Sequence, residues 1–138
     1  MRVFVDANIL VAVLNKELPL FDTAARVLSL ASRKDFIIFT SPICLAIAFY
    51  FSEKKSGAEK AKEKIGILCD HIEIAPSTNT SVQKALQNPK VLDLEDGFEY
   101  YAAIESKCDT MVTENREDFN FATIRVVNSR EFLKSLSV

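Results

Sequence analysis

Several residue types are scarce in this chain of 138 residues, and each scarcity excludes a class of protein. With only 3 glycines and 4 prolines, the chain holds no collagen-like or low-complexity stretch. Its three cysteines form no C-x-x-C pair, which argues against a disulfide framework or a structural zinc site. The longest apolar run, residues 43–51, is far shorter than the roughly 20 residues of a membrane span. No signal-peptide pattern follows Met1, so we expect a cytoplasmic protein without membrane association.

The charge balance and the apolar content favour one globular domain. There are 17 basic and 19 acidic residues, for a formal net charge of −2, which excludes a polyelectrolyte and a globally basic nucleic-acid-binding arm. Hydrophobic residues make up 49% of the chain, enough to build a core. We therefore expect a single domain over residues 1–138.

Short β-branched or aromatic runs alternate with longer segments of helical periodicity. We predict strands at residues 2–5, 36–39, 72–74, 110–113 and 124–127. Between them we predict helices at residues 8–14, 21–31, 42–52, 53–69 and 93–104, a helix to residue 86 that is capped by Ser77 or Thr80, and a last helix capped by Ser129. This alternation predicts an α/β fold, a three-layer α/β/α sandwich with a mostly parallel sheet of four or five strands.

Acidic and amide side chains follow the predicted strands or begin a predicted helix. They are Asp6 and Asn8 after the first strand, Asp93, Glu95 and Asp96 at a helix start, and Thr113, Asn115 and Asp118 after the fourth strand. In open α/β sheets, ligands bind at the carboxyl ends of the strands, so this topology can bring the three groups together. Converging carboxylates repel one another unless a cation neutralises them, and hard divalent ions take such oxygen ligands. The physical argument therefore predicts an acidic site that could hold a metal.

Purely structural explanations remain open for each acid. Asp93 is well placed as a helix N-cap, and Glu95 and Asp96 favour the first helical turn through the helix dipole. Asp6 could cap the helix that follows the first strand, and Asn115 with Asp118 could form only a turn.

Three motifs, in order along the chain, sharpen the interpretation. Phe4-Val5-Asp6-Ala7-Asn8-Ile9-Leu10 is a strand followed by D-x-N and an apolar helix. Residues 93–103, DLEDGFEYYAA, and residues 108–119, CDTMVTENREDF, follow at the expected spacing. Together they resemble the motifs of the PIN-domain family, and the resemblance covers essentially the whole chain. It implies a PIN-like α/β/α sandwich.

The resemblance also implies an activity. Many PIN domains are Mg²⁺- or Mn²⁺-dependent ribonucleases, among them the toxins of VapBC-type toxin–antitoxin pairs. Carried over by position, Asp6, Asp96 and Asp118 would be the catalytic, metal-binding carboxylates, and Asn8, Thr113 and Asn115 would shape the pocket. The implied reaction is in-line hydrolysis of an RNA phosphodiester by a metal-activated water, leaving a 5′-phosphate and a 3′-hydroxyl. The implied partners are an RNA substrate, a cognate antitoxin and a second copy of the chain in a homodimer.

Two positions depart from the family pattern. Ile47 stands where many members carry Glu or Asn facing the metal, and a hydrocarbon cannot ligate a cation. Glu114 stands where the T-R-N motif has Arg; it is expected to point outward, with a replacement ligand as the alternative. These departures motivate a second hypothesis, a degenerate PIN domain that binds RNA or a protein without cleaving RNA. A third, a phosphotransfer domain, is disfavoured because no D-x-D follows the first strand and no lysine ends a late strand.

Overall fold

The computed structural model describes residues 1–136, and within this range it contains seven α-helices, two short 3-10 helices and five strands. The strands are β1 (Arg2–Val5), β2 (Ile37–Thr40), β3 (Glu73–Ile74), β4 (Thr110–Val112) and β5 (Arg125–Val127). The helices are α1 (Ala7–Leu14), α2 (Phe21–Ser29), α3 (Pro42–Ser56), α4 (Ala58–Cys69), α5 (Asn79–Gln87), α6 (Leu94–Glu105) and α7 (Ser129–Leu136), with 3-10 turns at Leu30–Ser32 and Arg116–Phe119. No helix within the described range is both long and apolar enough to cross a membrane.

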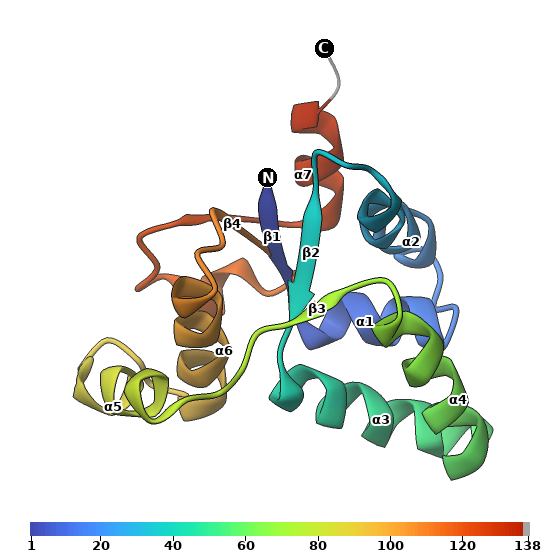
Figure 1. Ribbon diagram of the computed structural model, residues 1–138, viewed down its shortest axis with the longest axis horizontal. Helices are drawn as coiled ribbons and strands as arrows, with labels where there is room; N and C mark the ends of the chain where they lie inside the picture. Colours follow the sequence, from blue (N-terminus) through green and yellow to red (C-terminus); the bar gives the residue numbers. More distant parts are fainter. Residues whose placement is uncertain (137–138) are drawn as a thin grey trace.

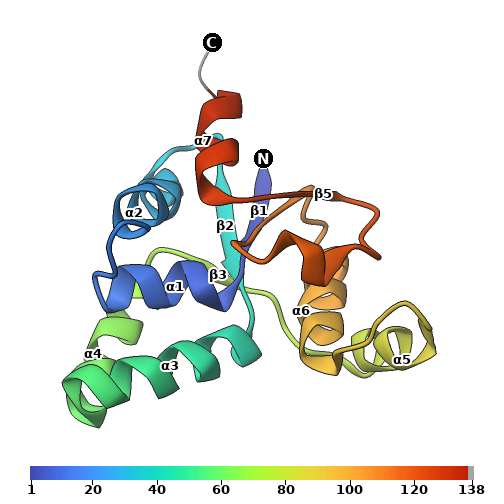
Figure 2. The same ribbon diagram turned by 180° about the vertical axis from the view of Figure 1, so that it is seen from behind.

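All neighbouring strands pair in parallel, in the order β3-β2-β1-β4-β5. Helices α5 and α6 lie on one side of this sheet, and α1, α2 and α7 lie on the other (Figure 1). Figure 2 shows the same three layers from behind, with α3 and α4 beyond the carboxyl ends of β1 and β2. The α/β/α sandwich predicted from the sequence is confirmed.

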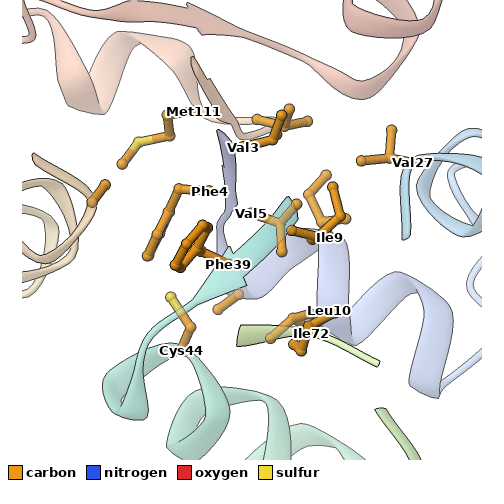
Figure 3. Packing of buried hydrophobic residues seen from close by; sticks show 14 of the residues in the cluster. Val3, Phe4, Val5, Ile9, Leu10, Val27, Phe39, Cys44, Ile72 and Met111 are labelled. Atoms are coloured by element: carbon orange, nitrogen blue, oxygen red, sulfur yellow. The ribbon is translucent and has the colours of Figure 1, made fainter. Parts of the chain in front are cut away.

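The core lies on both faces of the central strand β1. Because successive side chains of a strand point to opposite faces, Val3 and Val5 pack toward α1 and α2 while Phe4 points toward α6 (Figure 3). Phe4 is paired in register with Phe39 on β2 and with Met111 on β4, and all three are buried. Burial of β1 on both faces fixes the position of whatever follows its last residue.

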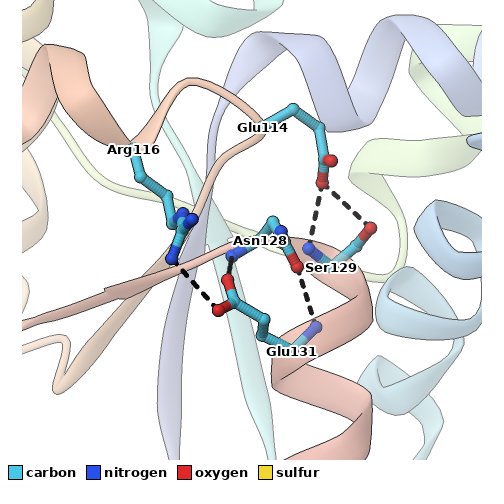
Figure 4. Close-up of polar contacts among 5 residues, drawn as sticks. All are labelled: Glu114, Arg116, Asn128, Ser129 and Glu131. Carbon is cyan, nitrogen blue, oxygen red and sulfur yellow. Dashed lines mark hydrogen bonds and ion pairs between the residues drawn. The ribbon is translucent and has the colours of Figure 1, made fainter.

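The helix boundaries differ from the predicted ones where capping groups compete. Thr78 rather than Ser77 or Thr80 caps α5, because its side chain accepts from the Ser81 amide while Ser81 Oγ accepts from the Thr78 amide. Asn128 rather than Ser129 plays this part for α7, through an equivalent reciprocal pair with Glu131 (Figure 4). Gly57, with φ of 86°, separates α3 from α4.

Candidate metal centre

The candidate site lies where the sheet changes direction. The chain leaves β1 toward β2 on one side and later returns to β4 on the other, so the carboxyl ends of β1 and β4 flank a crevice. Asp6 follows β1 directly, and its amide donates to Val112 O of β4 at 3.0 Å. Thr113 follows β4. The two strand ends are therefore held side by side at this point.

Asp6 is a buried carboxylate held by hydrogen bonds. Its Oδ1 accepts from the Ala7 amide at 2.6 Å, which caps α1, and its Oδ2 accepts from Thr113 Oγ1 at 2.7 Å. Asn8 Nδ2 lies 3.4 Å from the same Oδ2 and 3.3 Å from Thr113 Oγ1. Asp6 thus caps α1, and its carboxylate is also fixed in one orientation at the crevice.

The loop after β4 is tied to the same network. The amide of Asn115 donates to Thr113 Oγ1 at 3.1 Å, and the amide of Glu114 donates to Asn8 Oδ1 at 3.3 Å. Asn8 and Thr113 therefore position Asp6 and the loop together. Asn8 lines the crevice, whereas Thr113 is fully buried and does not.

A pocket of about 430 Å³ opens at this crevice, and its lining contains every predicted carboxylate. The polar lining residues are Asp6, Asn8, Glu17, Asp93, Glu95, Asp96, Asn115 and Asp118. Asp96 and Glu95 come from the first turn of α6, which Asp93 caps by accepting from the Glu95 amide at 3.0 Å. Asp118 comes from the 3-10 turn after β4. The structure thus brings Asp6, Asp96 and Asp118 to one pocket.

Apolar side chains form another part of the same lining. They include Ile47 of α3, which the family resemblance aligns with Glu or Asn, and the exposed Phe51. Ile47 offers no ligand atom, so α3 contributes no carboxylate to the pocket.

Glu114 neither lines this pocket nor simply points into solvent. Its Oε2 accepts from both the amide and the hydroxyl of Ser129, at 2.9 Å each, at the first turn of α7 (Figure 4). A carboxylate at a helix N-terminus is favoured by the unpaired amides there. The Glu114 carboxylate is therefore bound at the start of α7 and does not serve as a metal ligand in place of the residue that α3 lacks.

Sequence reasoning missed one acid of this site, Glu99. It lies on α6 one turn after Asp96 and is only 1% exposed. Single ligand atoms of Glu99, Asp6 and Cys44 lie within 4.8 Å of one another, and the same holds for Glu99, Glu95 and Asp96. The three-residue spacing from Asp96 placed Glu99 on the same helix face, and this was the one available signal.

Burial, together with the neighbouring acids, raises the affinity of these carboxyl groups for protons. Burial, followed by the charges of Asp93, Asp118, Asp6 and Glu95, raises the pKa of Asp96 to about 7. Burial, then the charge of Asp6 and a hydrogen bond to it, raises the pKa of Glu99 to about 11. Burial and the charges of Asp93 and Asp6 also raise the pKa of Glu95. Without a cation, these groups hold protons that carboxylates ordinarily release.

The donor set fits a hard divalent cation. Converging carboxylate oxygens, with amide oxygens nearby, are the ligands that Mg²⁺ and Mn²⁺ prefer, and a cation would remove the repulsion that raises these pKa values. The buried Cys44 thiol is a soft ligand, and burial raises its pKa further. A carboxylate-bound Mg²⁺ or Mn²⁺ is therefore the better match than zinc.

A second pocket of about 420 Å³ lies between α1, α2 and α4. Its lining is mainly apolar and includes Lys64 and His71 but no carboxylate. His71, predicted to be structural or on the surface, is exposed and lies away from the acids. The acidic pocket is thus the site with the means for metal chemistry.

The combination of this fold and this acidic crevice defines a class, the α/β/α domains with carboxylates at the sheet switch point. A family model described as "PIN domain" matches residues 2–117, and the chain belongs to the PIN-domain family. No curated protein sequence matches the chain.

Three solved structures have a similar fold. VapBC2 from Rickettsia felis, bound to a DNA fragment from its promoter, superposes with a TM-score of 0.70 at 24% identity, covering 93% of this chain and 98% of that one. Mycobacterium tuberculosis VapC20, a sarcin-ricin loop cleaving toxin, superposes with a TM-score of 0.67 at 17% identity, covering 88% of this chain and 95% of that one. FitAB bound to a DNA fragment superposes with a TM-score of 0.65 at 17% identity, covering 92% of this chain and 94% of that one. At these identities the likeness establishes the shared fold.

Proposed function

We propose that this protein is a metal-dependent endoribonuclease and the toxin component of a type II toxin–antitoxin pair. The observation that carries the proposal is the convergence of Asp6, Asp96 and Asp118 on one pocket at the switch point of a PIN-domain sheet. A cation would relieve the repulsion among carboxylates collected this closely, and a divalent cation held by carboxylates is suited to the hydrolysis of a phosphodiester.

Each residue has a distinct task in this proposal. Asp6, Asp96 and Asp118 would hold Mg²⁺ or Mn²⁺. A bound divalent cation supplies a polarised water for in-line attack on the phosphodiester and neutralises the charge that builds on the phosphate. Thr113 and Asn8 orient Asp6 through the bonds described above, and Asn115 lines the mouth of the pocket. No side chain forms a covalent intermediate, and the products carry a 5′-phosphate and a 3′-hydroxyl.

The proposed partners follow from the family and from the similar structures. VapBC2 and FitAB are complexes of two proteins on DNA, which supports a cognate antitoxin for this chain. We also propose a homodimer that acts on cytoplasmic RNA. Light scattering of the purified protein tests the dimer, which should have a mass of twice 15.5 kDa.

Cleavage of a mixed single-stranded RNA tests the activity. We expect cutting with Mn²⁺, none with EDTA, and a loss of at least about 100-fold in Asp6→Asn, because an amide is a weaker ligand than a carboxylate. The Asn side chain can still cap α1, so the variant should fold. Asp22→Asn, an exposed acid on α2, is the matched control and should cut like the wild type.

Ile47 favours one alternative, a degenerate PIN domain that binds RNA or a protein without cleaving RNA. Its hydrocarbon occupies a pocket wall where a ligand could stand. Folded, partner-free protein that binds RNA but does not cut it with Mn²⁺ would establish this alternative. Equal cutting by the wild type and Asp6→Asn would exclude the assigned site.

A further inference from the structure

Glu99 is the acid common to both carboxylate groups of the site. Its ligand atoms lie within 4.8 Å of Asp6 and Cys44 on one side and of Glu95 and Asp96 on the other. It therefore connects the acid that follows β1 with the acids that begin α6. None of the sequence motifs assigned a function to this position.

A structural explanation accounts poorly for a glutamate at this position. Glu99 is 1% exposed, and its Oε2 is buried without a hydrogen-bond partner. The ion pairs among residues 1–136 are Arg33–Asp35 and Arg116–Glu131, so within this range no basic side chain pairs with Glu99. A buried carboxyl group with an unused oxygen costs stability, and its nearest charged neighbours are other acids. A cation held between these acids would give the unused oxygen a partner.

The geometry of α3 and α6 explains why this acid would be needed. The two helices contact each other, and α3 presents Ile47 to the pocket. Asp96 and Glu99 lie three residues apart on one face of α6: Asp96 lines the pocket with Asp6, and a ligand atom of Glu99 lies within 4.8 Å of one of Asp6. Helix α6 thus delivers a carboxylate to the site that α3 leaves without one.

We propose that Glu99 is a metal-ligating carboxylate of this site, supplied by α6 where α3 carries Ile47. The proposal rests on the proposed metal-dependent function and deepens it: the ligand set would be Asp6, Asp96, Asp118 and Glu99. The buried Glu99 would bind the cation from the protein side, while the exposed Asp118 would bind it from the solvent side.

Calorimetric titration of the RNA-free protein with Mn²⁺ tests the ligand role. In Glu99→Gln the shape and the capacity for a hydrogen bond to Asp6 remain, but the charge is lost. We expect Mn²⁺ to bind this variant at least about tenfold more weakly than the wild type. Glu105→Gln is the matched control, since Glu105 lies on the same helix and hydrogen-bonds Thr78 outside the pocket. Its Mn²⁺ affinity should stay within about twofold of the wild type.

The outcomes separate the two proposals. Unchanged Mn²⁺ affinity in folded Glu99→Gln would overturn the ligand role and leave the nuclease proposal standing. A wild type that binds no Mn²⁺ would overturn the metal-dependent function and the ligand role together. If circular dichroism shows that Glu99→Gln is unfolded, Glu99→Asp replaces it: the shorter side chain should also weaken Mn²⁺ binding about tenfold, and wild-type affinity would refute the proposal.

Discussion

Asp6 shows how one residue joins structure and chemistry. The amide of Ala7 and the hydroxyl of Thr113 hold both of its oxygens, so the side chain has little freedom to turn away from its acidic neighbours. A carboxylate fixed in this way cannot relieve repulsion by moving. The repulsion is relieved instead by protons on Asp96 and Glu99 or by a cation.

Ile47→Glu tests whether α3 truly faces the metal. If it does, the new carboxylate adds a ligand, and we expect Mn²⁺ affinity to rise by at least about tenfold. Without metal the same change adds repulsion, so the Tm of the EDTA-treated variant should fall below that of the wild type. Calorimetry and thermal denaturation measure the two effects. A lower Tm with unchanged Mn²⁺ affinity would contradict the placement of Ile47.

Among single residues, the sequence indicated most of the candidate site but not Glu99. Asp6, Asp96 and Asp118 could be named because the resemblance to PIN-domain motifs singled them out among the acids that follow a strand or begin a helix. Glu99 could not, because it sits inside the helical pattern, where a single sequence gives its helix face but not what packs against that face. Glu114 was misjudged for a similar reason: its partner, Ser129, lies 15 residues away.

Helix α6 is the element on which the site depends. It carries Glu95, Asp96 and Glu99, and its position is fixed by close packing against α5 at Gly97. A Cβ built at Gly97 would lie 2.6 Å from Val91 Cγ1 and 3.0 Å from Ala85 Cβ, closer than van der Waals contact allows. A glycine at position 97 therefore allows α6 to pack closely against α5.

Gly97→Ala should destabilise the fold by about 1–3 kcal/mol, since the added methyl group overpacks a closed interface. It should also weaken Mn²⁺ binding, because α6 must shift with its acids. Gly66→Ala is the control: this exposed helical glycine has open space around it, and alanine there should stabilise by about 0.5–1 kcal/mol. Urea denaturation gives both values. Equal effects of the two substitutions would refute the packing argument.

The elements were largely predictable, and their ends were less so. The five strands stand out as β-branched or aromatic runs, and Ser41-Pro42 marks the start of α3. Neighbouring Ser, Thr and Asn residues compete for each cap, and the outcome depends on reciprocal bonds such as Thr78 with Ser81. The break between α3 and α4 was predicted after residue 52 but lies at Gly57, because the lysine- and glutamate-rich sequence around Gly57 is helical on both sides.

At the scale of the whole molecule, the acidic pocket lowers the stability of the fold by an amount that depends on pH. Asp96 has a pKa of about 7 in the fold against 3.8 for a free aspartate, and the pKa of Glu99 is higher still. At a pH between the pKa of each group in the unfolded chain and its higher pKa in the fold, the folded protein binds more protons than the unfolded chain. Stability from these groups is therefore complete at low pH and is lost as pH rises through the folded pKa values.

We accordingly expect the Tm of the metal-free protein in EDTA to fall as pH rises from about 5 to 8. Asp96→Asn should show a shallower fall, because it removes one of the titrating groups. With Mn²⁺ present the trend should reverse, since cations bind the deprotonated ligands. Differential scanning fluorimetry across this pH range provides the comparison. Parallel curves for Asp96→Asn and the wild type would show that Asp96 does not titrate there.

The central claim is that the acids at the end of β1 and the start of α6 form one divalent-metal site. Anomalous diffraction from crystals of the wild-type protein soaked in Mn²⁺ tests it most directly. The account predicts an anomalous peak between Asp6, Asp96, Asp118 and Glu99, within about 2.0–2.6 Å of carboxylate oxygens. A well-ordered pocket with no such peak at saturating Mn²⁺ would contradict it.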